Sequence, residues 1–131
     1  MRIALIVALV ASTAAAAQAR PPAPLVALEQ RGGFAGIERG LFVERSGKVV
    51  SDGLAVTTHR LTSAQLRALR AALVAARFPT LARHYESDVA IADGFVYRLS
   101  YGGRTVQYEE QADLPARLQR CVDLLNALVQ Q

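Results

Sequence analysis

Residues 95–109 read FVYRLSYGGRTVQYE and predict a β-hairpin. Apolar and polar side chains alternate strictly along residues 95–101, which is typical of a strand with one buried face. Gly102-Gly103 is a favoured two-residue turn between two such strands. The resulting register pairs Tyr101 with Arg104, Leu99 with Val106 and Tyr97 with Tyr108. One face of the hairpin is therefore predicted to be buried, while Arg98 faces the opposite side.

Two amphipathic helices are predicted around this hairpin. The first follows a capping box, in which Thr62 is the N-cap and Gln65 reaches back to its amide. It is expected to end by about Phe78, because Pro79 cannot continue a helix. The second helix is predicted over residues 114–129, with Asp113 as its N-cap. Its apolar stripe consists of Leu118, Val122, Leu125 and Leu128 or Val129.

Four further strands are predicted in the first half of the chain. They cover residues 25–30, 40–45, 48–51 and 54–60. Ser46-Gly47 reads as a two-residue turn, which would pair Val43 with Val50. Strands followed by a helix, a hairpin and a second helix predict an α+β fold: a largely antiparallel β-sheet with two amphipathic helices packed on one face.

The N-terminal segment has the pattern of an export signal. Residues 1–19 combine Arg2, an apolar run and the small-residue site Ala17-Gln18-Ala19. We expect cleavage after Ala19 and a periplasmic or secreted product. Residues 20–24 form a Pro-rich leader, and residues 25–131 a single α+β domain. The mature chain would carry 14 basic and 11 acidic residues, a net charge of +3.

Composition argues against several classes of function. One cysteine and two histidines leave little for a metal site, and no cofactor motif is present, so neither an enzyme nor a metal or cofactor site is expected. Fourteen of the fifteen basic residues are arginine, but no five of them form a compact block, which argues against nucleic acid. Cys121 lies beside the apolar stripe of the last helix and is predicted to be a small buried thiol.

A glycine-rich segment is the strongest candidate for a binding site. Three glycines within five positions permit positive φ angles and close approach of backbones. Phe34 would either fill the core beneath a strand connection, which we favour, or present an aromatic side chain to a partner. The Asp93-Gly94 turn is the second candidate. The partner-binding candidates are Arg31, Gly32, Gly33, Phe34, Ala35, Gly36, Ile37, Asp93 and Gly94.

Four segments, in order along the chain, resemble the emfourin family, small bacterial inhibitors of protealysin and related thermolysin-like metallopeptidases. They are RGGFAGIER (31–39), LTSAQLRALRAAL (61–73), ADGFVYRLSYGGRTVQYEE (92–110) and DLPARLQRCVDLLNAL (113–128). The resemblance covers roughly residues 26–129. This chain differs from the family pattern in its export segment and in a hairpin at residues 41–51.

The resemblance implies a monomeric protein that inhibits a zinc metallopeptidase by occluding its active-site cleft, without a metal of its own. An alternative is an envelope domain that binds a small apolar ligand, in a cavity lined by Phe95, Tyr97 and Tyr108. An enzyme would require a cleft that joins His59 or His84 to a carboxylate and a nucleophile.

Overall fold

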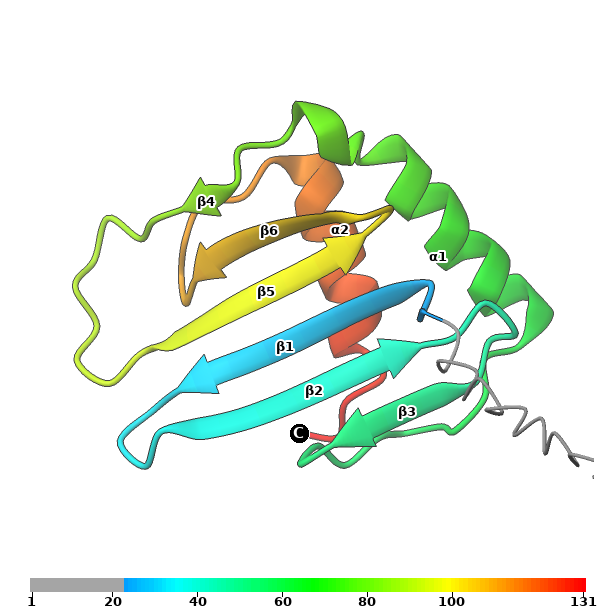
Figure 1. Ribbon diagram of the computed structural model, residues 1–131, viewed down its shortest axis with the longest axis horizontal. Coiled ribbons are helices and arrows are strands. Elements are labelled where there is room, and N and C mark those ends of the chain that lie inside the picture. The colour runs from blue at the N-terminus through cyan, green and yellow to red at the C-terminus, as the bar shows by residue number, and fades with distance from the viewer. Residues whose placement is uncertain (1–22) are drawn as a thin grey trace, which may run out of the picture.

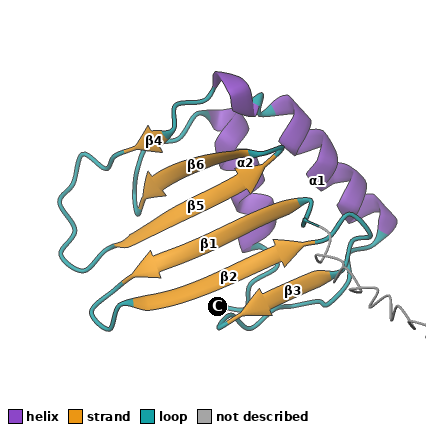
Figure 2. Ribbon diagram, viewed as in Figure 1, coloured by secondary structure: helices purple, strands orange, loops and turns teal. Residues whose placement is uncertain are grey.

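The computed structural model describes residues 23–131, which form one six-stranded sheet and two α-helices. The elements are β1 (Val26–Gly32), β2 (Ile37–Val43), β3 (Val49–Asp52), α1 (Ser63–Ala75), a 3₁₀ turn (Phe78–Thr80), β4 (His84–Tyr85), β5 (Phe95–Tyr101), β6 (Arg104–Glu109) and α2 (Ala116–Asn126). The strand order is β3-β2-β1-β5-β6-β4, and every pair is antiparallel except β4 with β6. Both helices cover the same face of the sheet (Figure 1, Figure 2), so the α+β prediction is confirmed.

The β5–β6 hairpin has the predicted register, with Tyr97 opposite Tyr108 and Leu99 opposite Val106. Gly102 and Gly103 have φ angles of 60° and 76°, the positive values that a tight hairpin of this twist requires. The helix-facing side of the sheet forms the core together with the stripes of both helices. Its largest fully buried side chains are Leu41, Leu73, Leu99, Leu118, Leu125, Val26, Val43, Val106 and Cys121.

The predicted pairing of Val43 with Val50 is wrong, because Val43 pairs with Val49. Three residues, instead of the predicted two, form the turn within the β2–β3 connection: the Glu44 amide donates to the Lys48 carbonyl at 2.8 Å across residues 45–47, and Gly47 adopts a φ of 89°. The extra residue shifts the register by one and reverses which side chains point inward. Val49 is therefore buried, whereas Val50 is 39% exposed on the opposite face.

Residues 54–60 do not form the predicted strand. They make only two isolated bridges, Lys48 with Arg60 and Val56 with Val129. The segment connects the edge strand β3 to α1, and its backbone bonds mainly to the C-terminal residues, although the Val49 amide of β3 donates to the His59 carbonyl at 2.9 Å. The Thr57 amide donates to the Leu128 carbonyl at 2.8 Å, and the Gln130 amide to the Ala55 carbonyl at 2.9 Å.

The capping box of α1 is confirmed by two hydrogen bonds, from the Gln65 amide to Thr62 Oγ1 and from the Thr62 amide to Gln65 Oε1. The helix ends before Pro79 requires it to end, because Arg77 adopts a left-handed conformation with φ 50°. In α2 the N-cap is Pro115 and not Asp113.

The boundaries of the other helices and strands also differ from the predicted ones. The first two strands cover 26–32 and 37–43 instead of 25–30 and 40–45, and α2 ends at Asn126. The predicted signal peptide and residues 20–22 of the leader lie outside the described residues. Within residues 23–131, no helix is long and apolar enough to cross a membrane.

Cys121 lies fully buried in the core, as predicted, and burial raises the pKa of its thiol to about 11 from an ordinary value of 9.0. In the unfolded chain the thiol loses its proton near pH 9, while the folded state keeps it until about pH 11. The unfolded state therefore binds fewer protons in this range, and stability falls as pH rises through it.

We expect the free energy of unfolding to decrease by about 1 kcal/mol between pH 8 and pH 10 through this group. Urea unfolding at a series of pH values measures it. Cys121→Ala is the control, because it loses packing at every pH but lacks the titrating thiol. An equal slope in the wild-type and Cys121→Ala proteins would contradict this origin.

Candidate protein-binding site

The glycine-rich segment forms the tip of the β1–β2 hairpin, at the end of the sheet that the helices do not cover (Figure 1). Its turn is closed by a hydrogen bond from the Gly36 amide to the Gly33 carbonyl at 3.1 Å. Gly32, Gly33 and Gly36 all have positive φ angles, of 128°, 75° and 60°. Below the turn, an ion pair of 2.9 Å joins Arg31 Nε to Glu38 Oε1 across the two strands. The tip is therefore a tight, braced protrusion.

Phe34 stands at this tip with 95% of its surface exposed. The expectation that it fills the core is therefore wrong. The reason is positional: β1 and β2 extend past the helices, so no helix covers the turn (Figure 1). Burying this ring against another molecule would remove a large apolar area from water, so the tip can serve as a contact with a partner.

The second candidate segment lies directly beside the tip. In the β1–β5 pair, Gly32 is opposite Phe95, so the chain leaving Gly94 passes against the base of the turn. A Cβ atom on Gly32 would lie 2.5 Å from the Gly94 carbonyl oxygen, and one on Gly33 would lie 3.1 Å from the Phe95 ring. Two segments some sixty residues apart in the chain are thus brought into contact, and glycine is what permits it.

The loop of residues 86–94 is fixed at both ends by consecutive glutamates at the end of β6. Glu109 Oε2 accepts from the Ser87 amide at 2.9 Å, and Glu110 Oε2 accepts from the Phe95 amide at 3.0 Å. Between these points, Val89 is 59% exposed. The loop encloses a hollow of about 710 Å³, lined by apolar residues that include Ile91 and by both glutamates.

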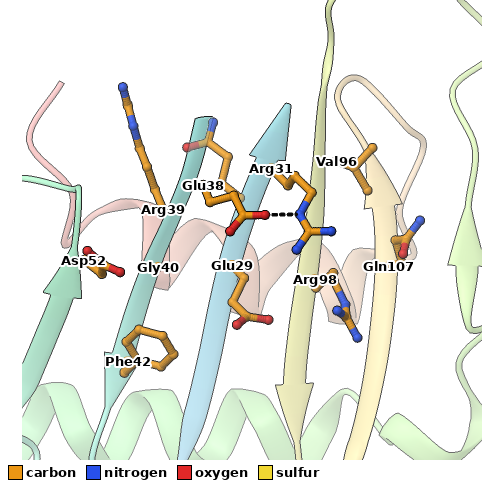
Figure 3. A pocket seen from close by; sticks show the side chains of 11 residues that line it. Glu29, Arg31, Glu38, Arg39, Gly40, Phe42, Asp52, Val96, Arg98 and Gln107 are labelled. Carbon is orange, nitrogen blue, oxygen red and sulfur yellow. Dashed lines mark ion pairs between the residues drawn. The ribbon is translucent and has the colours of Figure 1, made fainter. Parts of the chain in front are cut away.

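A shallow depression of about 400 Å³ occupies the sheet face that carries no helix (Figure 3). Gly40 forms part of its floor and the Phe42 ring lies over this glycine, since a Cβ there would be 2.7 Å from the ring. Its charged side chains are of both signs: Glu29, Arg31, Glu38, Arg39, Asp52 and Arg98. The sequence pattern does not reveal this surface, because polar residues at alternate strand positions are typical of any solvent-exposed face of a sheet.

The two histidines lie on opposite edges of the sheet. The His59 carbonyl bonds to β3, whereas His84 belongs to β4. His84 Nε2 is 3.9 Å from Glu109 Oε1, so one imidazole does lie near a carboxylate. An enzyme would also need a nucleophile bonded to the imidazole, but the hydroxyl of Ser87 accepts from the Val89 amide at 3.1 Å. No hydrogen bond links that serine to the imidazole in the part of the chain that the structure describes. Among those residues, no group of three His, Cys, Asp or Glu side chains is placed to hold a metal ion.

Phe95, Tyr97 and Tyr108 pack on one another and do not share a single cavity. The Tyr97 and Tyr108 rings stack with centroids 5.0 Å apart, and Phe95 lies 6.5 Å from Tyr97. Gln30 Nε2 donates to the Tyr97 hydroxyl at 3.3 Å. Burial raises the pKa of both tyrosines, most strongly that of Tyr108. In the described part of the chain, Tyr97 and Tyr108 line a shallow hollow of about 250 Å³, whereas Phe95 lines the separate hollow beneath the 86–94 loop, and this division weakens the small-ligand alternative.

The fold thus brings the two candidate segments together at one end of the sheet, with Phe34 and Val89 exposed there. This arrangement can bind another macromolecule by shape and apolar contact. The chain matches no protein-family model, no curated protein and no solved structure.

Proposed function

We propose that this chain is an exported protein-binding domain that inserts the Phe34 tip and the adjoining 86–94 loop into a cleft of a partner protein. The observation that carries the proposal is the 95% exposure of Phe34 on a braced hairpin. Large aromatic side chains supply much of the energy of protein interfaces. The closed turn and the paired strands below it limit the conformational entropy that the tip would lose on binding, which favours affinity.

The resemblance to emfourins suggests a thermolysin-like zinc metallopeptidase as the partner. An inhibitor of this kind occludes the active-site cleft, and a protruding hairpin tip beside a second loop has a suitable convex shape. A standard interface needs about 800 Å² from each partner, which a domain of this size can supply. Inhibition by occlusion does not involve removal of zinc, so added zinc is not expected to restore peptidase activity.

Replacing Phe34 by Ala is expected to weaken binding about thirtyfold, or about 2 kcal/mol, if the ring is an anchor in the partner's cleft. Stability should change by less than about 0.5 kcal/mol, because the exposed ring supports nothing in the core. Inhibition constants for a panel of thermolysin-like peptidases, including any encoded beside this chain, measure the effect. The matched control is Val74→Ala, since Val74 is 68% exposed on α1, away from the tip.

Two outcomes would count against the proposal in different ways. If wild-type protein inhibits but Phe34→Ala inhibits equally well, the tip is not the anchor. If the wild-type protein neither binds nor inhibits any of the peptidases, the proposed inhibitor function is wrong, although the fold is unaffected.

A further inference from the structure

Five cationic side chains gather at the end of the molecule opposite the Phe34 tip. They come from three segments: the β2–β3 connection, residues 54–60 between β3 and α1, and α1 itself (Figure 1). All five are exposed. We call this group the basic end, and its members are Arg45, Lys48, Arg60, Arg67 and Arg70.

Two of these five cationic side chains bond to backbone carbonyls and not to acids. Arg70 Nη2 donates to the Arg45 carbonyl at 2.6 Å, and Arg60 Nη1 to the Ser46 carbonyl at 3.4 Å. Lys48 and Arg60 are neighbours through an isolated β-bridge. Among the described residues, none of the five forms an ion pair, since the two pairs found there are Arg31–Glu38 and His84–Glu109. The positive charge of the basic end is therefore almost uncompensated.

Glu44 is the acid nearest in sequence to the basic end. Its carboxylate is 3.4 Å from Ser46 Oγ and accepts from that hydroxyl. One negative charge against five positive ones leaves a strongly cationic surface. Such a surface attracts anions over about a Debye length at physiological salt.

The solvent-facing side of α1 adds apolar contacts to this charge. No residue of the helix is acidic. Arg67, Arg70 and Val74 follow one stripe at spacings of three and four, and Val74 is 68% exposed. Exposed alanines fill the space beside them: Ala64, Ala68, Ala71 and Ala75. A helix face that combines arginine with small and branched apolar residues suits the boundary between lipid headgroups and acyl chains.

The chain also enters the domain at this end. The Leu25 amide donates to the Val43 carbonyl at 2.8 Å, beside the start of the β2–β3 connection. In the sequence that precedes it, residues 1–22 contain two arginines and no acid. After the expected cleavage, Arg20 and the new α-amino group would give the leader two positive charges and no negative one.

We propose that the basic end and the solvent-facing side of α1 dock on a membrane surface of anionic phospholipid. Arginine guanidinium groups pair with lipid phosphates in a bidentate manner, and each basic residue near such a surface adds to the affinity. The exposed alanines and Val74 favour lipid over a nucleic-acid backbone. Docking in this orientation directs the Phe34 tip away from the membrane (Figure 1), where a partner can reach it. The proposal does not depend on the identity of that partner.

The test is sedimentation with lipid vesicles, using protein purified after export, with its N-terminus checked by intact mass. We expect binding to phosphatidylcholine vesicles that contain about 30% phosphatidylglycerol, none to phosphatidylcholine alone, and loss of binding at about 0.5 M salt. Arg67→Gln/Arg70→Gln should lower the partition coefficient about tenfold or more. Arg83→Gln/Arg98→Gln removes the same charge from other exposed positions and should change it less than about twofold.

Arg67→Lys/Arg70→Lys keeps the charge and should bind nearly as well as wild type, which distinguishes a charge effect from misfolding. Three results would overturn the proposal: no binding to anionic vesicles at low salt, equal losses in the two glutamine pairs, or tighter binding to duplex DNA than to vesicles with the same dependence on Arg67 and Arg70.

Discussion

Replacing Leu99 by Ala is expected to lower the free energy of unfolding by about 3 to 5 kcal/mol. Leu99 is fully buried on β5, where its neighbours across the sheet are Leu28 on β1 and Val106 on β6. Truncation removes apolar contacts on both sides and leaves a cavity that the two neighbouring strands cannot close without breaking their pairing. Urea unfolding followed by circular dichroism measures the loss.

Arg98→Ala is the matched control, because Arg98 precedes Leu99 on the same strand and its side chain lies on the face without helices. It should change stability by less than about 0.5 kcal/mol. Comparable losses at the two positions would mean that β5 does not present Leu99 to the helices in solution.

Replacing Gly32 by Ala is expected to cost about 3 kcal/mol or more. Its φ of 128° lies where residues with a Cβ are strained, which alone costs about 1 to 3 kcal/mol. In addition, the new Cβ would lie 2.5 Å from the Gly94 carbonyl oxygen, a backbone atom that cannot rotate away. Relief requires the hairpin tip and the 86–94 loop to separate. The same variant should therefore lose partner binding as well as stability.

Gly36→Ala serves as the control within the same turn. Gly36 also has a positive φ, of 60°, but a Cβ there would meet nothing within 4 Å. Its replacement should cost only about 1 kcal/mol, the strain of a left-handed residue. If Gly32→Ala and Gly36→Ala cost the same, the close approach of the two segments does not occur in solution.

Features determined by neighbouring residues could be predicted from the sequence. The β5–β6 register follows from strict alternation on both sides of Gly102-Gly103, since a two-residue turn leaves one way to pair the strands. The start of α1 follows from Thr62 and Gln65, which cap it through side chains three residues apart.

Features determined by distant partners could not be predicted. The sequence allows either a two-residue or a three-residue loop at Ser46-Gly47. The loop length depends on whether Val49 or Val50 packs in the core, and in the folded protein Val49 is the buried one. The strand β4 is only two residues long, and it forms because it pairs with β6. Just before β4, the Arg83 carbonyl accepts from the Gln107 amide of β6 at 2.8 Å. So short a strand leaves no periodic signal.

The candidate site was partly predictable for the same reasons. Glycines marked residues 31–37 and 93–94 as unusual backbone, but their contact depends on the β1–β5 pairing. The exposure of Phe34 depends on where the helices cross the sheet, and no pattern around the turn encodes that. The basic end could not be predicted from the sequence, because its cations are spread over residues 45–70 and become neighbours only in the folded protein.

The place of β1 in the middle of the sheet sets the order in which the chain can fold. This strand is the first of the domain, yet its partner β5 comes near the end of the chain. Gly32, for example, pairs with Phe95. While the chain emerges from the ribosome, the β1–β2 hairpin has no second neighbour and the core stays open. Long-range pairing of this kind is slow to form. For the export that we propose, late folding of this kind would be an advantage, because a chain that is still unfolded can be threaded through a translocation channel.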